Sequence, residues 1–409
     1  MIDVADRTAF PPYRVAFPPL PSLLHPERAL ISRDLLSAVL RRRRPRDIWS
    51  APETAPESCD VAVVGGGVRA LGVARACATA GAKVALFASG EIAAAGDERA
   101  WPVVRAAHVD RLRSATDAAA PAMLRRVARS LGGVPIDVSG CLTLAEDSEA
   151  LGRAAARIKA DGAGAWMVPE REVVALSPPL AGFSHAALYE QAAITVDADA
   201  LALALAGAAV AAGARLFAGL GATALERDGP AATGLLLGDR AVRAGAIVLA
   251  DDFAAIRLIR EGNGRLSLTR EERVTLVTSG GAPAIGPALA VEDLRISRDR
   301  AGALSVSGPL GADALARRLL VLAPALAGLT VTDTEPVTVW TGVDGQPQIG
   351  AAGIDGVWLA LGFGREALSL ALPAAEHLAA AMSGDRGSPA FEPFAPTRGP
   401  GLRLEELVR

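Results

Sequence analysis

The chain has 409 residues, of which 51% are hydrophobic and 21% are charged. This balance is that of a globular protein with a sizeable core, so it excludes wholesale disorder. The formal net charge of −3 argues against a broad basic surface for nucleic acid. The longest uncharged run of small residues, 200–214, is shorter than the roughly 20 residues that a spanning helix needs. We therefore expect a buried helix there, no membrane span, and about two or three domains.

Residue types that mark other classes of site are sparse. The two lysines, Lys83 and Lys159, fall on a strand and a surface helix, which makes a pyridoxal Schiff base improbable. The three cysteines and four histidines show no CxxC or HExxH spacing, so we expect no metal site and no disulfide framework. The N-terminus has no charged start followed by an apolar run, so a cytoplasmic protein is expected.

The first 58 residues are predicted to form an arm and linker. Residues 1–27 are rich in proline and aromatic side chains, residues 30–40 have helical spacing, and residues 41–46 carry five arginines. A basic amphipathic segment can dock on an acidic partner or a membrane surface. Charge runs are more often solvated, which favours an arm packed on its own domain or on a sister subunit. Contact with a partner subunit through residues 1–50 is the alternative.

A strand, a glycine turn and a helix come next. Residues 61–64 form an unbroken apolar run, as in strands that are buried on both faces of a parallel sheet. Three glycines lead into a helical stretch over 68–80, which Gly81 ends. A second apolar strand follows over 84–87. The order strand, helix, strand predicts a βαβ unit.

The turn fits the pattern G-x-G-x-x-G/A, with Gly65, Gly67 and Ala70 in the three small-residue positions. The first glycine permits the tight turn, the second lets a pyrophosphate approach the backbone, and the third small residue lets helix and strand pack closely. Gly66 lies between them, and the first N–H groups of the helix would face the phosphates. A glycine turn without ligand is the alternative, but the flanking strand and helix favour a dinucleotide site.

An acid about 20 residues after the turn normally binds the ribose hydroxyls. Ala88 occupies that position, Ser89 follows, and the nearest acid is Glu91. Either Ser89 or Glu91 substitutes, or the ribose contact is missing. No arginine adjoins this strand end to hold a 2′-phosphate, so a flavin is favoured over NADP.

Periodicity predicts further elements along the chain. Helices are expected at about 101–132, 148–162, 197–213, 311–324 and 366–382. Strands are expected over 141–144, 215–218, 222–227, 232–237, 246–250, 329–340 and 357–361, with antiparallel alternation from 273 to 309. The last 25 residues are expected to be a loose tail.

In this order the chain resembles the D-amino-acid oxidase and sarcosine/glycine oxidase-like superfamily of FAD-dependent oxidoreductases, over roughly residues 59–384. The resemblance rests on the glycine turn, on residues 194–197 before a helix, on the pattern over 337–350, and on the closing strand, turn and helix over 357–382.

The resemblance implies an α/β (α+β) fold, in which a Rossmann-like FAD-binding domain is interleaved with a smaller antiparallel-sheet substrate domain. The expected segments are an arm and linker at 1–58, the FAD-binding domain at 59–135, 193–270 and 335–384, the substrate domain at 136–192 and 271–334, and a C-terminal tail at 385–409.

The resemblance also implies oxidation of an amine or amino-acid C–N bond by hydride transfer to FAD. The glycine turn would hold the pyrophosphate, and the backbone of Ala224 would contact the adenine side. Gly362, Phe363 and Gly364 would lie beside the flavin. The residues offer no clear catalytic base, and the family chemistry does not require one.

Several positions depart from the family pattern. Besides Ala88, a charged run over 97–99 replaces small residues, and Asp251-Asp252-Phe253 replaces a small-residue turn near the cofactor. Two carboxylates near a pyrophosphate are unfavourable unless they point away. No arginine lies between Trp340 and Asp344, where substrate or flavin often meets one. These departures raise a second hypothesis, a non-catalytic or flavin-poor subunit of a larger oxidase or dehydrogenase complex.

A few other side chains are candidates for the site. One interpretation is a polar cluster near the cofactor, formed by Asp97, Glu98, Arg99 and His108. We favour the alternative, a solvated helix start, because acidic side chains are stabilised at the N-terminal end of a helix dipole. Arg365 could bind a substrate carboxylate or form a surface ion pair. Four more residues could line the pocket, although aromatic residues at strand ends are more often core: Trp340, Phe363, Tyr189 and His185.

Overall fold

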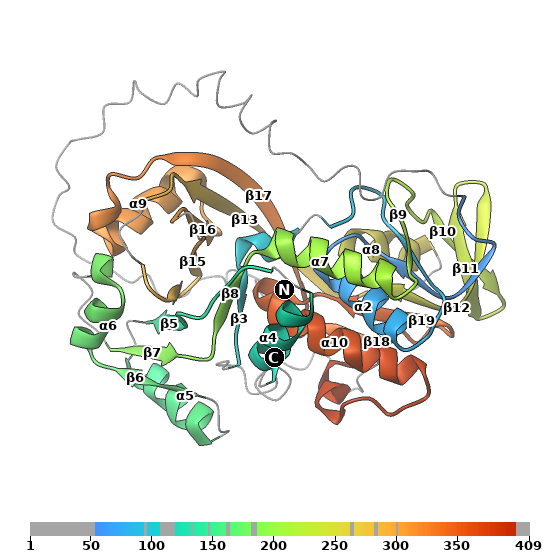
Figure 1. The fold of residues 1–409 in the computed structure, drawn as a ribbon, viewed down its shortest axis with the longest axis horizontal. Helices are drawn as coiled ribbons and strands as arrows, with labels where there is room; N and C mark the ends of the chain where they lie inside the picture. The colour runs from blue at the N-terminus through green and yellow to red at the C-terminus, as the bar shows by residue number, and fades with distance from the viewer. Residues whose placement is uncertain are drawn as a thin grey trace, which may run out of the picture. The chain divides into compact units, whose positions relative to one another are not determined.

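A computed structural model of the chain describes residues 54–93, 96–106, 119–131, 134–145, 148–160, 164–180, 186–261, 266–281, 285–299 and 302–397 (Figure 1). The predictions for the arm at 1–50 and for His108 and His185 lie outside these residues. Within them, the chain builds two eight-stranded sheets and one three-stranded sheet.

The first sheet carries the glycine turn. Its strands lie in the order β10-β11-β12-β1-β2-β9, and β19 and β18 continue it beside β12. The strands β12, β1, β2 and β9 run parallel to one another, β19 runs parallel to β12, and β11 is antiparallel to β12. The bounds are β1 (Ser58–Val64), β2 (Val84–Phe87), β9 (Arg215–Phe217), β10 (Ala224–Asp228), β11 (Ala231–Leu237), β12 (Arg240–Leu249), β18 (Gln348–Ala351) and β19 (Val357–Leu361).

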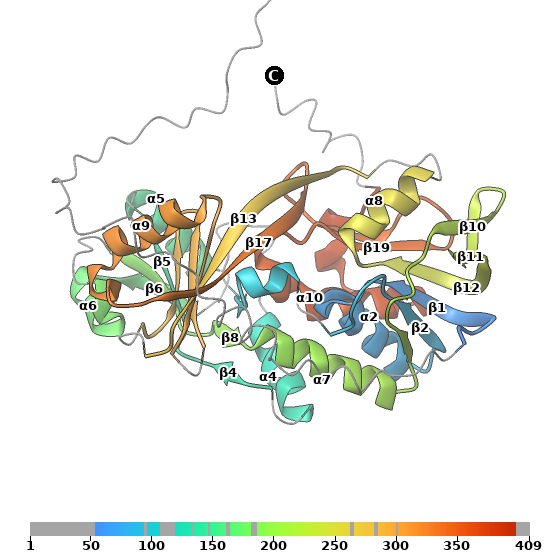
Figure 2. The same ribbon diagram turned by 90° about the horizontal axis from the view of Figure 1, so that it is seen from above.

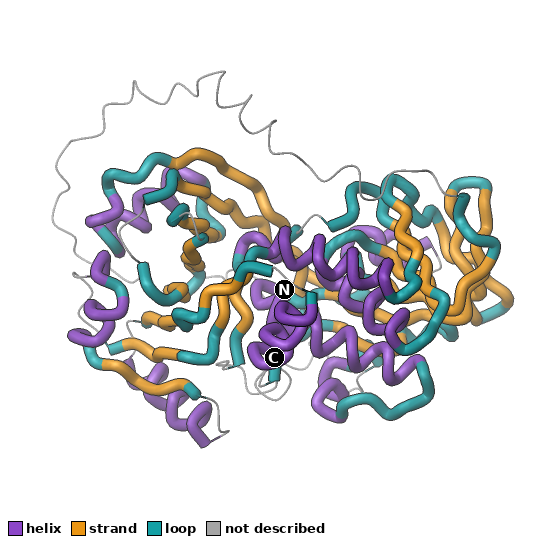
Figure 3. The backbone as a smooth tube through the Cα atoms, viewed as in Figure 1, coloured by secondary structure: helices purple, strands orange, loops and turns teal. Residues whose placement is uncertain are grey.

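Alternate residues of β1 enter two different cores, as the pleat of a strand requires. Val61 and Val63 pack on one face of the sheet, while Ala62 and Val64 pack on the other. The first face is covered by helices that lie side by side (Figure 3): α2 (Val68–Thr79), α4 (Ala120–Ser130), α7 (Ala198–Ala211) and α10 (Ala367–Met382). The second face is covered by α8 (Asp252–Glu261). Burial on both faces explains why residues 61–64 of β1 and all of β2 are apolar, whereas Ser58 and Asp60 lie at the exposed start of β1.

The second sheet has the order β17-β13-β16-β15-β14-β5-β7-β6 and is antiparallel except where β14 pairs with β5. Its strands are β5 (Cys141–Leu144), β6 (Ala165–Val168), β7 (Ala187–Glu190), β13 (Leu268–Thr278), β14 (Ala288–Val291), β15 (Leu294–Arg298), β16 (Leu304–Gly308) and β17 (Val331–Gly342). The helices of this part are α5 (Ser148–Ala160), α6 (Glu170–Leu176) and α9 (Ala312–Leu322).

Two structural features connect the large sheets: a pair of long strands and a small three-stranded sheet. The long strands β13 and β17 pair along their whole length and run from the second sheet toward the first (Figure 2). A bridge between Thr341 and Phe363 then ties the end of β17 to the turn after β19. The small sheet β3-β8-β4 completes the connection, with the bounds β3 (Val103–Val104), β8 (Ile194–Val196) and β4 (Ile136–Asp137).

The predicted fold class is confirmed, while the seven segment boundaries stay a prediction. The expected helix over 101–132 is wrong at its start, because residues 103–104 pair with β8 and the described helix begins only at Ala120. The expectation of a loose tail is wrong for residues 389–394, which form a 3-10 helix. Among the described residues, no helix is long and apolar enough to cross a membrane.

Phe394 anchors the C-terminal segment, because its side chain is fully buried and packs with Phe391 against the core beside α10. We expect Phe394→Ala to lower the free energy of unfolding by about 3–5 kcal/mol, the usual cost of truncating a buried phenylalanine. Denaturant unfolding monitored by circular dichroism measures this. Glu392→Ala, an exposed change in the same 3-10 helix, should alter stability by less than about 0.5 kcal/mol. Equal behaviour of the two variants would contradict the anchoring role.

Candidate nucleotide-binding site

The glycine turn lies at the carboxyl ends of the parallel strands, where open α/β sheets bind ligands. Gly65 has φ +135, a value that L side chains rarely adopt, and an added Cβ would lie 3.1 Å from Ala70 Cβ and 3.2 Å from the backbone of Ala250. At Gly66 an added Cβ would lie 2.6 Å from the carbonyl oxygen of Glu91. The turn is therefore closely packed on both sides, and glycine is required at both positions.

Gly67 is the N-cap of α2 and brings no side-chain cap. The first N–H groups of this helix therefore face the turn without a capping side chain, as an anion site needs. Ala70 is fully buried against the sheet, which matches its predicted role as the third small residue.

The end of β2 forms one wall of a cavity of about 260 Å³. Ser89 lies in this wall, and Gly221 approaches it so closely that an added Cβ would lie 2.8 Å from Ser89 Cβ. Ala88, in the position of the ribose acid, offers the cavity no carboxylate. The lining comprises Gly66, Gly67, Arg69, Ala88, Ser89, Gly90, Glu91, Gly96, Glu98, Ala250 and Asp251. Ala224 is not part of that lining and begins β10, two strands away from β12, so its contact with adenine stays a prediction.

A buried ion triad lies on the β12 side of the turn, where two of its members, Arg69 and Glu98, also line the cavity. The guanidinium of Arg69, in α2, pairs with Asp252 at 2.8 Å between Nη2 and Oδ2. It also approaches Glu98, with 3.9 Å between Nε and Oε1. Arg69, Glu98 and Asp252 are only 8%, 3% and 4% exposed, so water screens their interaction little. We call Arg69, Glu98 and Asp252 the triad.

The remaining contacts of the triad connect it to the closing turn. Asp252 Oδ1 accepts a hydrogen bond of 2.8 Å from the N–H of Gly362. Arg69 donates to the carbonyl of Ala360 at 3.5 Å, and its Cζ lies 5.4 Å from the ring centroid of Phe363. A cation over an aromatic face adds attraction. The triad thus joins the start of α2 to the ends of β12 and β19.

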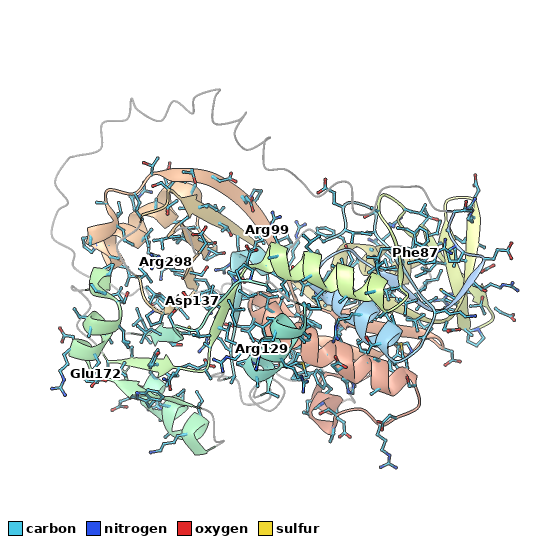
Figure 4. The ribbon with its side chains drawn as sticks, viewed as in Figure 1. Phe87, Arg99, Arg129, Asp137, Glu172 and Arg298 are labelled. Atoms are coloured by element: carbon cyan, nitrogen blue, oxygen red, sulfur yellow. The ribbon has the colours of Figure 1, made fainter. Side chains whose placement is uncertain are left out.

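The contacts of residues 97–99 show that the interpretation of this charged run as a helix start was wrong. These residues begin no long helix, and Glu98 is buried, where it accepts a hydrogen bond of 3.0 Å from the N–H of Gly96. Arg99 extends outward and pairs with Asp199 at the start of α7, in a position that Figure 4 shows. The hypothesis of a polar cluster near the cofactor therefore describes Glu98 better. The hypothesis of a solvated side chain describes Arg99 better.

The turn after β19 has the backbone that its glycines predict. Gly362 and Gly364 have φ +64 and +71, and the side chain of Phe363 between them is 1% exposed. Arg365 forms a forked ion pair with Glu271, with Nε–Oε2 and Nη2–Oε2 distances of 3.0 and 2.9 Å. The surface-pair interpretation of Arg365 therefore describes the structure.

A second buried charge cluster lies where the two large sheets approach, and we call it the seam cluster. Arg105 donates to Glu190 at 3.0 Å from Nε to Oε2, and its Nη1 lies 3.7 Å from Glu366 Oε1. Glu366 also accepts a hydrogen bond of 2.9 Å from Trp101 Nε1. Arg295, on β15, lies over the Trp101 ring at 5.5 Å and approaches Glu366 at 3.9 Å.

Burial dominates the electrostatics of the seam cluster. Burial lowers the pKa of Arg295, and Glu366 opposes that shift only in part. Around Arg105 burial acts in the same direction, but Cys141, Glu190 and Glu366 outweigh it and raise the pKa of that guanidinium. Arg295 Nε is buried and has no hydrogen-bond partner among the described residues. This cluster was missed from the sequence, since its members come from four distant segments.

The thiols of this chain are poor nucleophiles. Burial raises the pKa of Cys77 and Cys141 to about 12 and that of Cys59 to about 11. Because the thiolate is the reactive form, we expect slow labelling of the native protein by a thiol reagent at pH 8 and labelling of all three cysteines after unfolding. A mass spectrum after a short pulse measures this. Rapid modification of Cys141 in the folded protein would contradict its burial.

Two further aromatic candidates have structural partners. Trp340 packs edge-to-face on Phe253 with 5.2 Å between ring centroids, and Phe253 itself is 61% exposed. Tyr189, on β7, donates a hydrogen bond of 3.0 Å to the carbonyl of Ser139. Neither residue lines the cavity at the glycine turn.

The fold and this site define the class: an α/β protein with a Rossmann-like nucleotide-binding sheet that is coupled to a second, mainly antiparallel sheet. A protein-family profile described as FAD dependent oxidoreductase (DAO) matches residues 60–381. The chain therefore belongs to this family of FAD-dependent oxidoreductases. No curated protein sequence matches the chain.

Solved structures of several flavoenzyme relatives share the fold. Glycine oxidase from Geobacillus kaustophilus superposes with a TM-score of 0.77 at 21% identity, covering 84% of this chain and 100% of the other. L-proline dehydrogenase from P. horikoshii gives 0.77 at 18%, with coverage of 84% and 98%. Iminodiacetate oxidase from Chelativorans sp. BNC1 gives 0.72 at 22%, with coverage of 82% and 98%.

FAD, the cofactor of the family, fits one half of this site and not the other. The glycine turn, the uncapped start of α2 and the cavity beside β2 suit an adenosine diphosphate portion. The other half of a dinucleotide crosses the turn toward β12 and β19. There the triad is buried and mutually paired, so its side chains occupy that path.

Proposed function

We propose that the chain is an FAD-dependent oxidoreductase that oxidises the C–N bond of a small amine or amino acid. The observation that carries the proposal is the seam cluster, which places two arginines and two glutamates between the nucleotide-binding sheet and the second sheet. Paired opposite charges of this kind suit a zwitterionic substrate, whose carboxylate and amine need opposite partners.

Arg295 is the proposed carboxylate-binding residue. Its Nη1 donates to the carbonyls of Glu292 and Leu294 at 2.7 and 3.0 Å, whereas its Nε lacks a hydrogen-bond partner among the described residues and lies 3.9 Å from Glu366 Oε1. Such a guanidinium can exchange a weak protein contact for a forked bond with a substrate carboxylate. It would replace the arginine that the segment between Trp340 and Asp344 lacks.

Glu366 is the proposed partner of the substrate amine. It is the N-cap residue of α10, and its carboxylate approaches both arginines. In the oxidation the carbon next to nitrogen loses a hydride and the nitrogen loses a proton, which leaves an imine that water converts to a carbonyl compound and ammonia or a smaller amine. FAD supplies the acceptor of the two electrons in this family. The residues of the seam cluster bind and orient the substrate.

A panel of amino acids and amines tests the proposal by product formation. We expect carbonyl product, with ammonia or a smaller amine, only when protein, FAD and an amine or amino acid are all present. Heat-unfolded protein with FAD is the matched control. Absence of product across the panel in FAD-loaded protein would contradict the proposal.

The second candidate function is a flavin-poor or non-catalytic subunit of a larger oxidase or dehydrogenase complex. Two observations favour it: Ala88 removes the ribose carboxylate, and the triad lies across the other half of the cofactor path. Co-purification of a second subunit, lost after deletion of residues 1–50, would support this candidate.

A further inference from the structure

The order of strands fixes the direction in which a dinucleotide crosses this site. Its ribose half belongs at the end of β2, one strand to one side of β1, where Ala88 and Ser89 line the cavity. Its other half must therefore lie over β12 and β19, on the opposite side of β1. The triad lies on that second side.

The triad is held by contacts that come from three separate elements. Arg69 comes from α2, Glu98 from the 3-10 helix Asp97–Ala100, and Asp252 from the start of α8. Asp252 is bound twice, by Arg69 and by the N–H of Gly362, both at 2.8 Å. A buried guanidinium and carboxylate that satisfy each other close the path between the start of α2 and the ends of β12 and β19.

Entry of a flavin ring along this path would break the Arg69–Asp252 pair, because the pair joins the start of α2 to the ends of β12 and β19. We infer that the triad is a latch over the flavin half of the site, so that the closed protein accepts an adenosine diphosphate portion alone and takes FAD only after Arg69 leaves Asp252. This inference rests on the proposed function for the identity of the cofactor.

The latch makes a prediction about ligand choice in the wild-type protein. A ligand that needs a state populated at a fraction f binds with an affinity reduced by that fraction. ADP fills the cavity, which Arg69 and Glu98 line, without parting Arg69 from Asp252, so its affinity does not contain this factor. We therefore expect flavin-free wild-type protein to bind FAD no more than about ten-fold more tightly than ADP, since the latch removes the gain from the ring.

The matching variants remove both partners of the Arg69–Asp252 pair, while Glu98 keeps its hydrogen bond from the N–H of Gly96. Arg69→Met with Asp252→Gly takes away both partners of the pair and returns a small residue to the cofactor turn. We expect this double variant to bind FAD at least about ten-fold more tightly than wild type, while ADP, which meets Arg69 in the cavity, is bound no more tightly. Arg75→Met with Glu376→Gln removes another ion pair of α2, which joins it to α10, and should change neither affinity.

Isothermal titration with FAD and with ADP, on the three proteins freed of flavin, measures all six affinities, and a thermal melt checks that each variant folds. Two results would overturn the latch. One is wild-type protein that binds FAD more than about a hundred-fold more tightly than ADP, which needs no variant. The other is a folded double variant whose FAD affinity equals that of wild type. A double variant that gains FAD yet oxidises no amine would uphold the latch and contradict the proposed function.

Discussion

Replacing Arg105 by alanine is expected to lower the free energy of unfolding by about 3–5 kcal/mol, the usual cost of breaking a buried pair. The physical reason is the environment of Glu190, whose side chain is 1% exposed and which Arg105 binds at 3.0 Å. Without the guanidinium this carboxylate stays buried without its cation. Thr143 and Glu366 lose a donor and an ion-pair partner as well.

Chemical denaturation of wild type and variant measures the difference. Arg129→Ala is the matched control, because Arg129 is exposed on α4 (Figure 4) and donates only to the carbonyl of Arg125. We expect its effect to stay below about 0.5 kcal/mol. The double variant Arg105→Met with Glu190→Met should recover part of the loss, since an apolar pair leaves no uncompensated charge. An Arg105→Ala protein as stable as wild type would contradict the buried pair.

Replacing Arg295 by methionine is expected to raise KM for amino-acid substrates by about 100-fold, which corresponds to roughly 3 kcal/mol of lost binding. Arg295 is the proposed carboxylate partner, and methionine keeps its length while removing its charge. The side chain is only 13% exposed, so solvent cannot replace the lost contact. Primary amines without a carboxylate should show the same KM in both proteins.

Steady-state kinetics on matched pairs of substrates, each amino acid beside its decarboxylated amine, separates this role from a general loss of structure. Arg295→Lys should recover part of the binding, because a lysine keeps the charge but not the fork. An equal rise in KM for both members of a pair would indicate a disturbed fold. An unchanged KM for the amino acids would place the carboxylate elsewhere.

The local patterns were sufficient for much of the fold. The predicted strands at 84–87 and 357–361 have the bounds of β2 and β19. Both are short apolar runs that end at glycine or a small residue. The hydrophobic pattern and the turn-forming residue therefore predict the same boundary. The glycine turn was predictable for the same reason, because its function depends on three consecutive residues and the two elements beside them.

The two buried charge networks were not predictable to the same degree. Asp252 was recognised as unusual, but its partner Arg69 lies far from it in the sequence, and nothing local indicates which arginine turns inward. The sequence did not settle where the two carboxylates point: Asp251 lines the cavity and accepts a hydrogen bond of 2.8 Å from the N–H of Ala254, and Asp252 is turned inward, paired with a cation. The helix predicted to begin at Trp101 failed because pairing of 103–104 with β8 outweighs local propensity.

The most direct test of the proposed activity is a single-turnover experiment on protein loaded with excess FAD and freed of oxygen. A carboxylate-bearing amine is added, and the visible absorption of the bound flavin is followed. The account predicts bleaching that depends on the amine and is weakened in Arg295→Met. A flavin that stays oxidised with every amine and amino acid, in wild type and in the Arg69→Met, Asp252→Gly variant alike, would contradict it.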